Sequence, residues 1–427
     1  MSLKKEGYIT RLIDEQIETS LKTFSAVCIE GPKYCGKTWT ALKYSNSVIY
    51  IGDPSKNFQN RTMARLDENS VLLGTNPRLL DEWQEVPSLW DAVRFVSDAD
   101  NRKGKFLLTG SATPVHKGIL HSGTGRISKI SMTTMSLHET GDSDGSVSLK
   151  KLFEGKLELT QSKSVDLDEL IYLTIRGGWP CNIGLDEKAC LNFSKAYLKT
   201  VIEDDIYRID EIKRDQNKIR FLVKSLARNV STIVSNKKLI SDVKEQSEVP
   251  IANETLNEYL DILKRLFIIE EQPSFSANLR STVKIGKNPK RHFADPSLAI
   301  AAMGLTNDQL KKDLNTFGFI FESFCYHDLK IYAESIGASI YHYRDKLNRE
   351  IDIVIQLSDG RWGAFEVKLG NSQIDEAANN LIKLQKILEN DSKADSPSIL
   401  VIVSGQSNIA YTRKDGVMVV PIYALKN

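Results

Sequence analysis

The chain has 427 residues, which is more than one ordinary domain holds, and this length predicts two or three domains with well-filled cores. Its 57 lysines and arginines nearly balance 55 aspartates and glutamates, so whole-chain charge gives no case for nucleic-acid binding and any such surface must be local. No apolar run approaches the roughly 20 residues that span a bilayer, and the N-terminus lacks a signal-peptide core, so we expect a cytoplasmic protein without a membrane partner. The five cysteines contain no CxxC pair, which argues against a disulfide framework and a zinc site.

The first predicted elements alternate helix and strand. Residues 9–23 repeat apolar groups at helical spacing, and AVCIEG is typical of a short buried strand that ends at a glycine. Three further apolar segments, SVIYIG, RLLDEW and KFLLTGS, are separated by polar or helical stretches. This rhythm is typical of a parallel sheet covered on both faces. It predicts an α/β domain over residues 1–140.

A phosphate-binding loop is predicted between the first strand and the next helix. The segment GPKYCGKT matches the pattern G-x-x-x-x-G-K-[ST], in which glycines allow tight turns whose amides cradle phosphate oxygens. We expect Lys37 to reach the β and γ phosphates of ATP and the Thr38 hydroxyl to hold Mg²⁺. The alternative is a simple glycine turn before a helix. The predicted ATP-binding residues are Gly31, Pro32, Lys33, Tyr34, Cys35, Gly36, Lys37 and Thr38.

Acidic and hydroxyl side chains follow two of the later strands. Asp81 and Glu82 come at the end of RLLDEW, and carboxylates at this edge of a parallel sheet face the phosphate loop. Asp81 suits Mg²⁺ coordination, and Glu82 suits polarising the attacking water. Thr109 or Ser111, at the end of KFLLTGS, could sense the γ-phosphate. The alternatives are a solvated strand end for the acids and a Thr-Gly-Ser turn for the hydroxyls.

Four segments together carry a family resemblance: GPKYCGKT, RLLDEWQEVPSLWDAVR, FLLTGSATP and HSGTGRISKISMTTMSLHE. They resemble the prokaryotic AAA+ ATPases fused to a C-terminal domain of unknown function. The resemblance implies an AAA-type ATPase domain followed by a C-terminal domain similar to PD-(D/E)xK nucleases. It also places Arg126 where such proteins often carry a basic residue near the nucleotide. A surface arginine is the alternative, and action within one chain or between two chains stays open.

The predicted middle of the chain is helical. Residues 141–167 begin with a polar, glycine-containing stretch and are predicted to be a linker or exposed loop. Residues 168–304 contain three helical segments followed by a strand, which suggests a winged-helix-like domain. Acids on one face of the third helix would repel phosphates and favour a structural role over DNA recognition. The basic run RSTVKIGKNPKRH, residues 280–292, is the local candidate for touching a nucleic-acid backbone, with a solvated loop as the alternative.

Residues 305–427 are predicted to run helix, three strands, helix and strand, the order that the resemblance implies for a restriction-endonuclease-like α/β domain. Side chains alternate along a strand, so Glu366 and Lys368 share a face and Asp352 should lie opposite them on the neighbouring strand. Asp352 and Glu366, assisted by Glu322, could bind Mg²⁺ or Mn²⁺, while Lys368 orients the attacking water. The alternative is an inactive domain in which Lys368 pairs with one of these acids.

The sequence therefore predicts a protein that binds and hydrolyses ATP with Mg²⁺, and whose nuclease-like domain acts on or binds DNA or RNA under nucleotide control. The rival hypothesis is an ATP-controlled interaction module. Its nuclease-like domain would be catalytically inactive and would bind a protein or a nucleic acid. Metal-dependent cleavage of nucleic acid discriminates the two. Because AAA+ relatives often form rings, an oligomer is compatible with either hypothesis.

Overall fold

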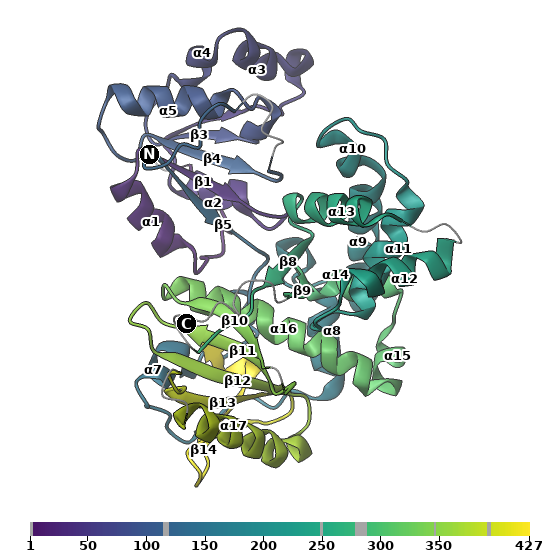
Figure 1. The fold of residues 1–427 in the computed structure, drawn as a ribbon. Coiled ribbons are helices and arrows are strands. Elements are labelled where there is room, and N and C mark those ends of the chain that lie inside the picture. Colours follow the sequence, from purple (N-terminus) through teal and green to yellow (C-terminus); the bar gives the residue numbers. More distant parts are fainter. Residues whose placement is uncertain (1–2, 114–118, 248–250, 278–287, 346, 391–393) are drawn as a thin grey trace.

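The computed structural model describes residues 3–113, 119–247, 251–277, 288–345, 347–390 and 394–427. Figure 1 shows three parts: an N-terminal sheet domain, a mainly helical middle and a C-terminal domain built on a second, larger sheet. A helix able to cross a bilayer is absent from this described portion, where none combines the necessary length and apolar character.

The N-terminal domain contains a five-stranded parallel sheet in the order β2-β3-β4-β1-β5, which confirms the predicted parallel α/β architecture. Helices α1 and α2 pack on one face, and α4 and α5 pack on the other. Its elements are α1 (Asp14–Thr23), β1 (Ala26–Glu30), α2 (Lys37–Lys43), β2 (Ser47–Tyr50), α3 (Ser55–Leu66), α4 (Glu68–Leu72), β3 (Arg78–Asp81), η1 (Trp83–Glu85), α5 (Leu89–Ala99), β4 (Phe106–Gly110), β5 (Ile127–Ser131) and α6 (Leu137–Thr140).

Strand β1 lies inside this sheet, between β4 and β5, and all five of its residues are buried. β4 pairs with β1 on one side and β5 on the other. The sequence did not predict β5 as a strand. Only Ile127 and Ile130 of its five residues are buried, as an edge position requires, so it lacks the apolar run that marks the central strands.

Four helices of the middle part begin after an aspartate whose carboxylate accepts a hydrogen bond from a first-turn amide, the usual way to satisfy a helix N-terminus. These aspartates are Asp166, Asp186, Asp215 and Asp295. The elements are α8 (Leu167–Arg176), η2 (Pro180–Asn182), α9 (Glu187–Thr200), η3 (Val201–Asp205, a π-helix), α10 (Ile206–Arg208), α11 (Gln216–Arg228), α12 (Asn236–Ser247), α13 (Asn253–Arg265), β8 (Ile269–Gln272), β9 (Lys290–Phe293), α14 (Pro296–Met303) and α15 (Asn307–Lys312).

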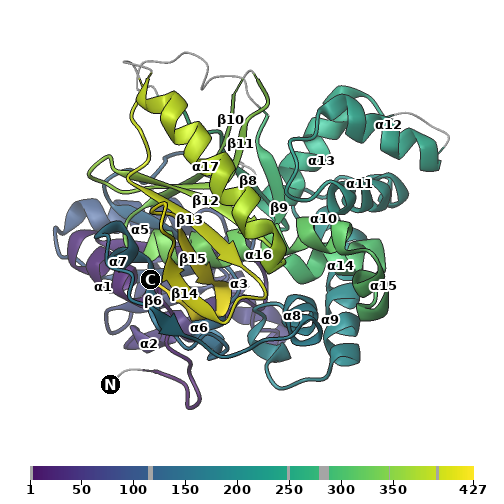
Figure 2. The same ribbon diagram turned by 90° about the horizontal axis from the view of Figure 1, so that it is seen from below.

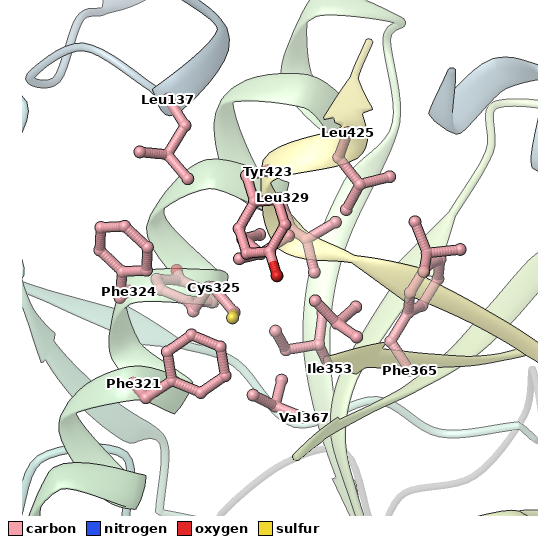
Figure 3. Packing of buried hydrophobic residues seen from close by; sticks show 14 of the residues in the cluster. Leu137, Phe321, Phe324, Cys325, Leu329, Ile353, Phe365, Val367, Tyr423 and Leu425 are labelled. Carbon is pink, nitrogen blue, oxygen red and sulfur yellow. The ribbon is translucent and has the colours of Figure 1, made fainter. Parts of the chain in front are cut away.

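The C-terminal sheet has the order β10-β11-β12-β13-β15-β14-β7, where β7 is Thr160–Gln161, and it is covered on both faces. Helix α16 packs its aromatic residues on one face (Figure 3), and α17 covers the other (Figure 2). The elements are α16 (Leu314–Ser335), β10 (Ser339–Arg344), β11 (Glu350–Gln356), β12 (Trp362–Lys368), η5 (Asn371–Gln373), α17 (Ile374–Glu389), β13 (Ile399–Ser404), β14 (Ile409–Thr412), β15 (Met418–Pro421), η6 (Ile422–Ala424) and β16 (Leu425–Lys426).

The segment predicted as a linker or exposed loop, residues 141–167, belongs to this C-terminal fold instead. Strand β6 (Val147–Ser148) pairs with β16, and β7 (Thr160–Gln161) forms the edge of the seven-stranded sheet. Helix α7 (Leu149–Phe153) buries its apolar residues in the core beneath α16. The prediction is wrong because the polar stretch ends at Val147 and is followed by apolar residues that need a core.

Candidate functional site

The phosphate loop has the backbone geometry that its glycines predict. A Cβ on Gly31 would lie 1.9 Å from the carbonyl oxygen of Met132, so no side chain fits there. Gly36 has φ 107° and precedes the first residue of α2, a conformation that side chains rarely adopt. The turn therefore brings loop amides to the N-terminus of α2, where an anion is favoured.

The side chains at the end of the loop meet the ends of β3 and β4. The Lys37 ammonium is buried and donates to the carbonyl of Pro32 at 2.7 Å. The Thr38 hydroxyl donates to Asp81 Oδ1 at 2.8 Å, and the Thr109 hydroxyl donates to the same oxygen at 2.7 Å. Burial raises the pKa of Asp81, although both hydroxyl donors oppose the shift. A hydroxyl and a carboxylate oxygen are hard ligands, so Thr38 and Asp81 fit Mg²⁺.

Glu82 lies beside this group in a left-handed backbone conformation, with φ 58°. Its amide donates to the Thr109 hydroxyl at 3.2 Å. Its carboxylate accepts from the Ser111 hydroxyl at 2.9 Å and from the side-chain amide of Gln84. The Thr109 and Ser111 hydroxyls thus donate to different carboxylates. Sequence reasoning missed Gln84, which directly follows the Asp-Glu-Trp segment.

Arg126 does not lie at the phosphate loop of its own chain. It precedes the first residue of β5, at the same level as Ala26 at the start of β1, whereas the loop follows the other end of β1. Five strand residues separate these edges, roughly 16 Å. The half-exposed guanidinium pairs with Asp98 at 2.6 Å. This position corrects the expectation of a basic residue beside the chain's own nucleotide.

The exposed turn of the phosphate loop contacts the middle domain. Lys33 Nζ lies 2.6 Å from Asp205 Oδ1 at the end of the π-helix η3. The Tyr34 ring meets the Phe193 ring of α9 edge-on, with 6.3 Å between centroids. These two predicted ATP-binding side chains are therefore engaged with another domain. Single π-helical turns occur frequently at functional sites.

A buried arginine joins the loop to the rest of the molecule. Arg11 Nη1 donates to the carbonyl of Cys35 in the loop at 2.8 Å, and Nη2 donates to the Thr133 carbonyl after β5 at 3.0 Å. Its Nε pairs with Glu139 of α6 at 3.0 Å. Although burial opposes it, this arginine helps to keep the pKa of Glu139 below its usual value.

The end of β5 continues this connection to helix α16. The Thr134 hydroxyl donates to Asp295 Oδ2 at 2.7 Å and lies 2.8 Å from His327 Nε2. The Leu137 amide donates to Asp328 Oδ2 at 2.9 Å. The phosphate loop, the middle domain and α16 therefore share one network of buried polar contacts.

The four predicted nuclease-like residues come from β11, β12 and α16 and lie close together. Lys368 Nζ lies 2.8 Å from Glu366 Oε2 and 3.7 Å from Asp352 Oδ2. Asp352 Oδ2 also accepts from the Val367 amide at 2.9 Å. Two residues that sequence reasoning did not assign to this cluster join it: Lys290 Nζ lies 2.8 Å from both Glu322 Oε1 and Glu350 Oε1.

The carboxylate cluster consists of Glu322, Glu350, Asp352 and Glu366, and burial shifts the pKa of Glu322 and Glu366. It raises the pKa of Glu322 to about 8, and nearby Asp352 adds to the shift. The pKa of Glu366 is likewise raised to about 8, first by burial and then by Asp352. Burial lowers the pKa of Lys290, but Glu322 and its neighbours more than reverse this and raise it.

The carboxylate cluster resembles a Mg²⁺ or Mn²⁺ site in its oxygen ligands. Its carboxylates have suitable chemistry, yet both lysine ammonium groups already lie within hydrogen-bonding distance of their oxygens. Across the described ranges, no group of three or more His, Cys, Asp or Glu residues is arranged to hold a metal ion. In this conformation the residues present do not fit the predicted divalent metal.

The basic run at residues 280–292 is only partly described, because Arg280, Lys284 and Lys287 lie outside the described residues. Its last two basic residues are buried. Lys290 enters the carboxylate cluster, and Arg291 Nε pairs with Glu271 Oε1 at 3.2 Å. Neither presents its charge to solvent, which corrects the expectation that these two residues contact a nucleic-acid backbone.

Three family models match successive parts of the chain. Residues 23–141 match the AAA domain family. Residues 167–309 match a domain of unknown function (DUF8612), and residues 317–425 match another domain of unknown function (DUF4143). The N-terminal part is therefore similar to AAA domains.

Similar whole proteins include an uncharacterized protein of Mycobacterium tuberculosis, 22% identical over 83% of this chain and 72% of its own length. An uncharacterized protein of Haemophilus influenzae is 22% identical over 74% of this chain and 78% of its own. Among solved structures, a Walker-type ATPase of Pyrococcus abyssi matches with TM-score 0.45 and 12% identity, covering 70% of this chain and 97% of that one. The replication initiator DnaA bound to AMPPCP and single-stranded DNA matches with TM-score 0.27 and 14% identity, covering 61% and 91%.

Proposed function

We propose that this protein binds and hydrolyses ATP at the phosphate loop and that its nucleotide state controls contacts of the middle and C-terminal domains. The observation that carries the proposal is the convergence of Thr38 and Thr109 on one oxygen of Asp81, with Glu82 held beside them. Thr38 and Asp81 would hold Mg²⁺, which neutralises phosphate charge, and Glu82 would orient the attacking water.

The direct test is phosphate release from ATP by the full-length protein with Mg²⁺. We expect turnover that requires both Mg²⁺ and ATP and stops when EDTA is added. If nucleotide binds, as measured by calorimetry, without phosphate release above background, the hydrolytic part of the proposal fails. Absence of both binding and turnover would overturn the assignment of the loop.

Nucleotide control is supported by the contact between the phosphate loop and η3. With Lys33 held by Asp205, one loop cation is directed toward the middle domain. We expect Asp205→Asn to release Lys33 and to tighten ATP binding up to about five-fold, since such a partly exposed pair is worth about 1 kcal/mol or less. Calorimetric titration of ATP measures the effect.

Asp204→Asn is the matched control for that prediction. It removes the same charge one residue earlier, from an exposed side chain. Equal ATP affinities of the two variants would show that the pair between Lys33 and Asp205 does not restrain the loop. A weaker affinity of Asp205→Asn alone would show that the pair supports the nucleotide-binding conformation instead.

A second candidate function is action on DNA or RNA by the C-terminal domain. It is supported by the convergence of Glu322, Asp352, Glu366 and Lys368 on a sheet with a helix on each face. In the middle domain, α11, α12 and α13 are followed by the antiparallel pair β8 and β9, an order compatible with a winged-helix-like unit. The rival is an interaction module that binds its partner without cleavage.

Labelled single- and double-stranded DNA and RNA, incubated with Mg²⁺ or Mn²⁺ with and without ATP, separate these functions. If the domain is a nuclease, cleavage should fall by at least about 100-fold in Lys368→Ala, the lower range for one positioned catalytic group. Intact ATP turnover without cleavage of any substrate would favour the interaction module. Cleavage that survives in Lys368→Ala would exclude this cluster as its source.

A further inference from the structure

Lys290 is a middle-domain residue buried inside the carboxylate cluster of the C-terminal domain. Its side chain is 1% exposed, and its ammonium lies 2.8 Å from oxygens of Glu322 and Glu350, with Asp352 Oδ1 at 3.8 Å. Lysine is almost never fully buried unless it is paired. Three carboxylates on two different elements, α16 and β11, pair with it here. The cluster is therefore built around a positive charge that the chain itself supplies.

The backbone that carries Lys290 is fixed on both sides. Lys290 pairs across the β8–β9 ladder with Gln272, whose side-chain amide donates to the carbonyls of Tyr341 at 2.8 Å and Asp352 at 3.0 Å. Two residues along β9, His292 stacks on Tyr326 of α16 with 3.9 Å between ring centroids. These contacts attach β9 to the C-terminal sheet and to α16. The attachment of β9 therefore fixes the backbone from which the Lys290 side chain enters the cluster.

The ammonium and a divalent metal compete for the same oxygens. Mg²⁺ needs ligands at about 2.0–2.1 Å in near-octahedral geometry. Glu322 and Glu350 each direct an oxygen at Lys290, and Glu366 directs one at Lys368. A metal ion that used these oxygens would lie within a few ångströms of two ammonium groups in a buried site, where repulsion between cations is poorly screened.

We propose that Lys290 is the resident cation of the carboxylate cluster and replaces the divalent metal that the nuclease resemblance predicts. The wild-type cluster then binds no Mg²⁺ or Mn²⁺, and its acids serve to join the middle domain to the C-terminal domain. This inference goes beyond the proposed ATPase function and does not depend on it. It favours the interaction module for the C-terminal half.

The experiment is a Mn²⁺ titration of the nucleotide-free, full-length protein, with free Mn²⁺ measured by electron paramagnetic resonance. Wild-type protein should show no Mn²⁺ binding that Asp352→Asn removes. Lys290→Met, which keeps the length of the side chain but removes its charge, should create a site at least ten-fold tighter than any in the wild type. Adding Asp352→Asn to Lys290→Met should abolish the new site.

Lys330→Met is the matched control. Lys330 is a largely buried lysine of α16 that pairs with Glu270, away from the cluster, so its loss should destabilise the protein without creating a Mn²⁺ site. The proposal is overturned if wild-type protein binds Mn²⁺ in an Asp352-dependent manner, a result that needs no folded Lys290 variant. It is also overturned if folded Lys290→Met gains no Mn²⁺ affinity, or if Lys330→Met gains as much. Because no nucleotide is present, failure of the ATPase proposal would leave these readouts unchanged.

Discussion

Replacing Lys37 with alanine is expected to weaken ATP binding by about 10- to 100-fold. Hydrogen bonds to charged groups are worth about 1.5–3 kcal/mol, which corresponds to this loss of affinity. Of the two lysines in the loop, Lys37 is the one whose ammonium is buried within it, where it would meet the phosphates. In this structure the Lys37 ammonium donates to the Pro32 carbonyl, and on ATP binding phosphate oxygens would replace that carbonyl as its acceptor. Calorimetric titration of ATP measures the loss, with thermal unfolding as a check on folding.

Lys33→Ala is the matched control for this prediction. Lys33 belongs to the same loop and carries the same charge, but its ammonium pairs with Asp205. Because that pair is partly exposed, we expect its loss to change ATP affinity by less than about five-fold. Equal weakening by the two variants would mean that overall loop charge, and not the placement of Lys37, governs nucleotide binding.

The geometry of the candidate ATP site could be predicted from sequence because local spacing encodes it. The segment around Gly31, Gly36 and Lys37 fixes a turn between a buried strand and a helix, and the acids end a neighbouring strand. In a parallel sheet such strand ends meet at one edge, so Asp81 could be placed near Thr38 without knowing the remaining fold. The edge strand β5 escaped prediction because burial of only two residues leaves no clear apolar pattern.

Contacts between distant segments could not be predicted in the same way. Arg11 reaches Glu139, and Lys33 reaches Asp205, across more than a hundred residues each. Charge alone does not identify such partners, because about a quarter of the chain is charged. Lys290 shows the limit of sequence prediction most clearly. It lies in a basic run typical of a solvated loop, yet it is buried in β9, which pairs with β8.

The arrangement of the nuclease-like residues could be predicted from sequence, but their surroundings could not. Alternation along β12 places Glu366 and Lys368 on one face, and β11 brings Asp352 beside them, as the strand pattern predicts. Their chemistry depends on neighbours that no local pattern reveals. Glu350 and Lys290 change the predicted metal site into a cluster in which ammonium groups of the same chain lie against the carboxyl oxygens.

Glu82→Gln is expected to preserve ATP binding and to lower hydrolysis by about 10²- to 10⁴-fold, the usual contribution of a positioned general base. Glutamine keeps the length of the side chain and an oxygen that can accept from Ser111, so the local fold should survive. It cannot accept a proton from water at neutral pH. Calorimetry for binding and phosphate release for turnover separate the two effects.

Glu85→Gln is the control, because Glu85 ends the same short helix but pairs with Arg61 at the surface. It should hydrolyse ATP at nearly the wild-type rate. Wild-type turnover in Glu82→Gln would remove Glu82 from the mechanism. Ser111 and Gln84 both donate to Oε2 of Glu82, so the same result would indicate that the other oxygen, Oε1, does not activate the attacking water. A strong loss in Glu82→Gln alone would instead support Glu82 as the group that activates the attacking water, with Ser111 and Gln84 fixing its Oε2 at the ends of β3 and β4.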